Sequence, residues 1–166
     1  MNLDFLFNYK NKLMEDIITD EKIVSLINDS VKTEEEAHSL IYSQVFPHGF
    51  IPETLGHAKT CIYFDIDIQR AFNSTYLQPR LYIWVLVHNS EVRLPGGGVR
   101  DDAICSAISQ RINGSKEYGL GEINLSAVTR YTPTMDFSGK VMTFDATDFN
   151  RVYDPKKKVP SNRKRW

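Results

Sequence analysis

Apolar positions at helical spacing open the chain and predict three helices. The first covers residues 3–18, where four apolar side chains fall near one face: Leu3, Leu6, Leu13 and Ile17. Asp20 can cap a second, short helix whose apolar positions follow directly. Thr33 and Glu36 form a capping box, which begins a third helix because each side chain can bond a backbone N–H of the other residue. Pro47 and Gly49 end this helix, and residues 47–60, with two prolines and two glycines, form a loop.

Strict alternation of apolar and polar residues over residues 60–68 predicts a half-buried strand. After a polar connection, Pro79 stands just before the next strand. Residues 81–87 are apolar on both faces, which predicts a central strand. We expect this strand to be covered on both sides, or to be covered on one side and paired with a partner chain on the other.

The second half of the chain predicts one helix and two strands. Residues 89–100 form a loop, and residues 101–112 repeat apolar positions at helical spacing behind two carboxylates that suit the helix dipole. Residues 122–131 alternate, and four side chains share one face of this strand: Ile123, Leu125, Ala127 and Thr129. A turn at residues 137–140 leads to the last strand, residues 141–149, which completes a hairpin.

This order of elements predicts the α+β class, with a mostly antiparallel four-stranded sheet packed against helices. The N-terminal helices precede the sheet, and a basic C-terminal arm follows it. A chain of 166 residues is long enough to bury a core without a metal or disulfide staple. We therefore expect a single domain over residues 1–150 and a basic extension over residues 151–166.

The formal net charge of −1 hides an uneven distribution. Residues 151–166 hold seven Lys and Arg against one Asp, a net +6, whereas residues 1–150 hold 13 basic and 20 acidic residues, a net −7. Pro155 and Pro160 exclude a regular helix or central strand from the basic segment. It is either a frayed, solvated terminus or an arm that docks on an acidic surface or on nucleic acid. Its candidate contact residues are Lys156, Lys157, Lys158, Arg163, Lys164, Arg165 and Trp166.

A glycine-rich loop is the second candidate contact. Gly96, Gly97 and Gly98 precede a helix, as a phosphate-binding loop would, but the chain has neither GxxxxGK[ST] nor GxGxxG. Asp101 and Asp102 at the start of that helix would also repel phosphate. We interpret the segment as a flexible loop that can serve as an assembly contact.

Catalytic or metal-binding signatures are missing from the sequence. Asp65 and Asp67 share a strand face as two metal ligands could, yet the neighbouring strand offers no further acid or lysine for a metal-dependent nuclease. His48, His57 and Cys61 lack the usual zinc spacings. The sequence thus predicts no catalytic residue, no metal and no cofactor, and we expect a protein that is not an enzyme.

The two cysteines, Cys61 and Cys105, form no CxxC motif and indicate buried free thiols of an intracellular chain. No apolar run is long enough to span a membrane. Residues 1–13 lack the pattern of a signal peptide.

The layout of residues 33–150 carries a resemblance. A helix and a long loop lead to the following elements in order: the strand Thr60–Ile68, the strand Pro79-Arg80-Leu81-Tyr82-Ile83-Trp84-Val85, the helix Asp101–Ile112 and the closing strands Glu122–Thr132 and Lys140–Phe149. This order resembles the neck proteins of tailed bacteriophages, in particular the tail terminator (tail completion) family.

The resemblance implies a structural protein of the virion neck, assembled in the host cytoplasm. Tail terminators form a six-fold ring that caps the tail tube, stops its polymerisation and presents the surface on which the head connector docks. The implied partners are further copies of the chain in a ring of six, the tail tube protein and the head–tail connector protein, with the tail sheath as a further candidate and no membrane. The family has no catalytic residues. A net −7 body fits a lumen through which DNA passes without specific binding.

Two alternatives stay open. The extra helical residues 1–30 and the extension 151–166 also fit a head–tail adaptor, or head-closure connector, of the same neck. A nucleic-acid-binding module acting through the basic arm would instead bind DNA with an affinity that falls steeply with salt.

Overall fold

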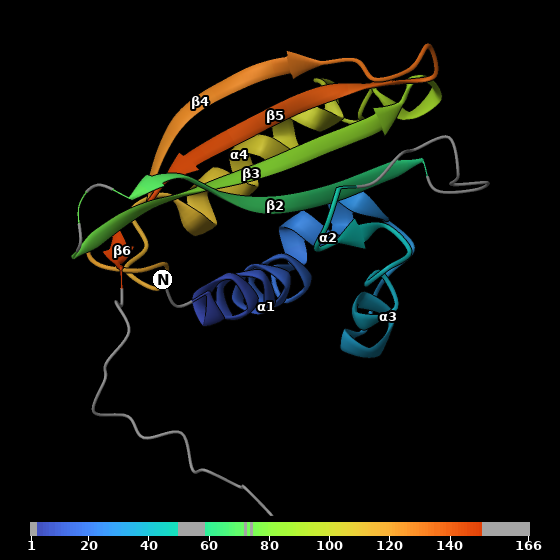
Figure 1. Ribbon diagram of the computed structural model, residues 1–166. Helices are drawn as coiled ribbons and strands as arrows, with labels where there is room; N and C mark the ends of the chain where they lie inside the picture. The colour runs from blue at the N-terminus through green and yellow to red at the C-terminus, as the bar shows by residue number, and fades with distance from the viewer. Residues whose placement is uncertain (1–2, 50–58, 72, 74, 151–166) are drawn as a thin grey trace, which may run out of the picture.

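The computed structural model describes residues 3–49, 59–71, 73 and 75–150. Within these residues the helices are α1 (Asp4–Ile18), α2 (Glu21–Ile27), α3 (Glu34–His38), the short 3-10 helix η2 (Asn89–Glu91) and α4 (Arg100–Ile112). The strands are β1 (Val45–Phe46), β2 (Thr60–Ala71), β3 (Tyr76–His88), β4 (Asn124–Tyr131), β5 (Phe137–Asp145) and β6 (Asp148–Phe149). They form a curved sheet with α1, α2 and α4 against a single face (Figure 1).

The helices α2 and α3 begin at the predicted caps, and α1 begins one residue later than predicted. The Asp20 side chain accepts hydrogen bonds from two backbone N–H groups of α2, and the capping box of Thr33 and Glu36 is present at α3. The predicted extent of the third helix is wrong, because α3 ends at His38. Three successive backbone N–H groups beyond it all donate to the carbonyl oxygen of Leu40, so the chain turns instead of continuing the helix.

The sheet has the order β1-β2-β3-β5-β4, and β6 pairs with the start of β3. Among the described strands, β1 and β2 run parallel and the other pairs are antiparallel. The α+β class and the mostly antiparallel sheet are confirmed. The predicted number of four strands is wrong, because β1 and β6 were not expected. Each has two residues, too short to show alternation.

Two predicted strand boundaries are also wrong. Pro79 lies inside β3, opposite Ile68, where the register of β2 shifts. A proline is tolerated at such an irregularity because the ladder needs no N–H there. Residues 137–140, predicted as a turn, are the first four residues of β5, and residues 132–136 make the connection. The predicted last strand is divided between β5 and β6.

A register shift in β4 separates two residues that the sequence places on one face. Leu125 pairs with Phe144, whereas Ala127 pairs with Thr143. Neighbouring residues of a strand point to opposite faces, so Leu125 packs toward the helices and Ala127 lies on the other side. The predicted shared face of Leu125 and Ala127 is therefore wrong.

The main core lies between the sheet and the helices. Its fully buried side chains include Leu13, Ile17, Ile23, Ile62, Phe64, Ile83, Ile104, Ile108, Ile112 and Phe144. The face of the sheet opposite these helices is called the helix-free face below.

Candidate interaction surface

The helix-free face carries a second, smaller hydrophobic cluster that is mostly aromatic. Its buried members are Phe46, Cys61, Tyr63, Leu86 and Phe137, and the partly buried Trp84 and Tyr131 pack against it. The rings of Tyr63 and Trp84 are stacked at a centroid distance of 4.8 Å, and those of Tyr82 and Trp84 at 5.7 Å. Three aromatic rings thus form a continuous row across β2 and β3.

Strand alternation explains this row. In β3, Ile83 and Val85 point into the main core, so Tyr82 and Trp84 must point to the opposite face. Tyr63 is the direct cross-strand neighbour of Trp84, which brings their rings together. The prediction that residues 81–87 are apolar on both faces is confirmed, because one face packs into the main core and the other belongs to the aromatic cluster. Their pairing with a partner chain stays a prediction.

Polar groups border the aromatic row. Burial and a hydrogen bond with Tyr131 raise the pKa of the Tyr63 hydroxyl, which therefore stays neutral. Arg80 forms an ion pair with Asp145 at 2.6 Å, and hydrogen bonds with Asp145 and Tyr82 raise the pKa of its guanidinium. An apolar centre with a charged border is the usual composition of a protein–protein interface.

The predicted glycine loop is a closed turn before α4. The backbone N–H of Leu94 donates to the Gly98 carbonyl at 3.1 Å, and that of Gly97 donates to the Leu94 carbonyl at 3.0 Å. Gly97 and Gly98 have φ angles of 91° and 90°, which other residues adopt only with strain. The structure places Gly96, Gly97 and Gly98 on an exposed turn, and their role as an assembly contact stays a prediction.

The predicted basic contact residues Lys156 to Trp166 lie outside the described residues, as does His57. The arm therefore stays a prediction.

Of the two carboxylates considered as metal ligands, Asp65 forms an ion pair with Lys10 of α1 at 2.6 Å. Asp67 lies opposite Arg80 in the strand register. The His48 Nδ1 atom lies 2.8 Å from the carbonyl oxygen of Gly49. Among the described residues, no group of three or more His, Cys, Asp and Glu side chains could hold a metal ion. No described helix is both long and apolar enough to cross a membrane.

The aromatic row was not singled out by sequence reasoning, although a signal was present. Tyr63 alternates with the core residues of its strand, and Tyr82 and Trp84 do the same in theirs. The alternation within each strand does not reveal which residues of β2 and β3 lie side by side.

Both cysteines are buried and free, as predicted. Burial raises the pKa of the Cys61 and Cys105 thiols from the usual 9.0 to about 12. The buried Tyr63 and Tyr118 and the half-buried Tyr9 also have pKa values raised chiefly by burial.

We expect the free energy of unfolding to decrease as the pH rises above about 9. Between pH 9 and about 12 the unfolded chain loses thiol protons that the folded chain keeps, so alkali favours unfolding. Each thiol contributes about 1 kcal/mol per pH unit in this window, and the tyrosines act in the same direction. Urea unfolding at a series of alkaline pH values measures the effect, and a double Cys→Ala variant should show a shallower decrease. A stability that is constant above pH 9 would contradict the burial of these groups.

The family model described as YomW matches residues 20–146, from the cap of α2 to the residue after β5. No curated protein and no solved structure matches the chain.

Proposed function

The chain belongs to the YomW family, a phage-derived family of the Bacillus SPbeta type, and on this premise we propose that it is a structural protein of the phage virion. We place it in the head–tail neck as a tail terminator. In this role copies of the chain form a ring that caps the tail tube and joins it to the head connector. The family membership supports a phage protein, and the resemblance of residues 33–150 to tail terminators supports the neck.

The aromatic side chains on the helix-free face are the observation that supports a structural role. Tyr82, Trp84 and Tyr131 are partly exposed on a sheet face that no described helix covers. Aromatic side chains are enriched in protein–protein interfaces, where they bury a large area at a small entropic cost. A second subunit or a neighbouring neck protein packed on this face would bury the aromatic row.

Deletion of the gene from its phage tests the proposal. Without a terminator, the tube continues to polymerise, so electron microscopy should show overlong tails and unjoined heads. Tails of normal length beside separate, DNA-filled heads would instead favour the alternative of a head–tail adaptor. Normal infectious particles without the protein would overturn a structural role in the neck.

Complementation of this deletion tests the helix-free face itself. We expect a copy with Tyr82→Ala to restore about one tenth of the infectious particles that the wild-type copy restores, because an interface aromatic commonly contributes a factor of this size to affinity. Phe7→Ala is the matched control: Phe7 is 70% exposed on α1, on the helix side of the sheet. Equal recovery with both variants would exclude Tyr82 from the interface.

A further inference from the structure

A groove of about 800 Å³ lies between α2 and the segment that leads into α3. Its apolar lining consists of Ile18, Val24, Val31 and Ala37, and its polar lining includes Glu21, Lys22, Lys32 and Glu34. Three of the apolar side chains, Ile18, Val24 and Ala37, are less than 10% exposed and also belong to the main core. The groove therefore has a buried apolar floor below a charged rim.

The charged side chains that line the groove are balanced, two glutamates against two lysines, and the excess of carboxylates lies in the surrounding segment. Residues 20–36 contain six Asp and Glu and two Lys, a net charge of −4. The Lys22 ammonium group donates to the Gln110 side chain at 3.2 Å. Backbone N–H groups of Lys32 and Thr33 lower the pKa of Glu36, so this carboxylate is ionised at neutral pH. Glu21, Glu34 and Glu35 are exposed. The groove thus suits a basic segment with some apolar side chains.

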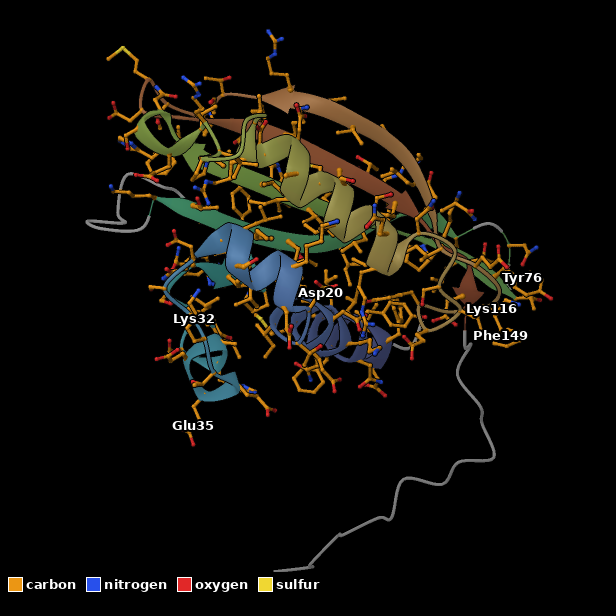
Figure 2. The ribbon with its side chains drawn as sticks, turned by 180° about the vertical axis from the view of Figure 1, so that it is seen from behind. Asp20, Lys32, Glu35, Tyr76, Lys116 and Phe149 are labelled. Atoms are coloured by element: carbon orange, nitrogen blue, oxygen red, sulfur yellow. The ribbon has the colours of Figure 1, made fainter. Side chains whose placement is uncertain are left out.

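The groove and the start of the basic segment lie at opposite ends of the molecule. β6, the last described strand, pairs with Tyr76 and Leu77 at the start of β3. β1, which follows α3, pairs with β2 at Ile62, and Ile62 pairs with Val85 eight residues further along β3. Eight residues of a strand span about 26 Å. Figure 2 shows the same separation, with Phe149 and Tyr76 at one end and Lys32 and Glu35 at the other.

We propose that residues 151–166 of one copy bind the α2–α3 groove of a second copy. Their net charge of +6 complements the −4 of residues 20–36, and their Val159 and Trp166 supply apolar side chains for the floor of the groove. Sixteen residues reach at most about 55 Å, enough to extend onto a neighbouring copy. The same reach also covers the groove of the segment's own copy, about 26 Å away. The proposed contact is the one between copies, which is head-to-tail and can repeat to close a ring.

This contact adds a specific interface to the proposed function. It rests on that function only in expecting that copies of the chain form a ring. It gives the basic segment a partner within the assembly. It also assigns to the N-terminal helical region a binding role in addition to its packing role.

Mixing two full-length variants tests the contact. The groove variant is Glu34→Gln with Glu35→Gln, and the arm variant is Lys156→Gln, Lys157→Gln and Lys158→Gln. Native mass spectrometry and analytical ultracentrifugation of each variant alone should show self-association weakened at least about tenfold, since several charge pairs are removed together. The mixture should recover a 1:1 pair, because the intact segment of the groove variant can bind the intact groove of the arm variant.

A control variant, Glu122→Gln with Asp136→Asn, removes the same charge away from the groove and should associate like the wild type. A mixture that stays as dissociated as its components would overturn the proposal, since it would mean that the segment binds within its own copy or binds elsewhere. A wild-type chain that is monomeric at every concentration would also overturn the contact, while the neck function would still be decided by gene deletion. If the arm variant differs from the wild type only in its affinity for DNA, the partner of residues 151–166 is nucleic acid and not the groove.

Discussion

Replacing Gly139 by alanine is expected to lower the free energy of unfolding by about 3 kcal/mol, because β5 and β3 leave no room for a Cβ atom. An ideal Cβ at this position would collide with the carbonyl oxygen of Val85 and lie 3.1 Å from the Cα of Leu86. Both obstacles belong to the backbone of the neighbouring strand, so no flexible side chain can move aside. The strands must separate locally, and the pairing of Gly139 with Leu86 is weakened.

Urea unfolding followed by circular dichroism measures this loss. Gly96→Ala is the matched control, since no atom lies within 4 Å of a Cβ at Gly96 and its φ is not in the left-handed region. Its unfolding free energy should stay within about 0.5 kcal/mol of the wild type. Equal midpoints for the two variants would show that the strands do not approach so closely.

Replacing Asp16 by alanine is expected to cost about 3 kcal/mol, because this buried carboxylate joins three parts of the fold. It is only 2% exposed. It accepts hydrogen bonds from the Tyr118 hydroxyl at 2.6 Å, from Arg111 at 2.8 Å and from Lys12 at 3.0 Å. Arg111 and Lys12 can turn toward water, but the Tyr118 hydroxyl is buried and would lose its acceptor.

Glu15→Ala provides the comparison for Asp16, since Glu15 is its exposed neighbour on α1. We expect a change within about 0.5 kcal/mol for Glu15→Ala. Asp16→Asn should fall between the two variants, because an amide oxygen can still accept from Tyr118 but carries no charge for Arg111 and Lys12. An Asp16→Ala variant as stable as Glu15→Ala would mean that the three hydrogen bonds contribute nothing net to folding.

The candidate interaction surface was only partly predictable. The apolar run at residues 81–87 predicted a strand that needs cover on both faces, and the structure places helices on one of them. The row formed by Tyr63, Trp84 and Tyr82 depends on the register between β2 and β3. The groove beside α2 likewise depends on how the chain turns after α2 and packs residues 31–37 against it.

The sequence by itself determined the local features: the caps at Asp20 and Thr33, the helix at residues 101–112 and the alternation of β2. Each depends on residues a few positions apart, whose interactions are the same wherever the segment lies. The tertiary structure decided the extension of β5 over residues 137–140, the register shift in β4 and the early end of α3. These features depend on hydrogen bonds between strands and on packing between distant segments. In β5 that long-range pairing overrides the turn preference of the sequence around Gly139, because a residue without a Cβ is also the one that fits against Val85.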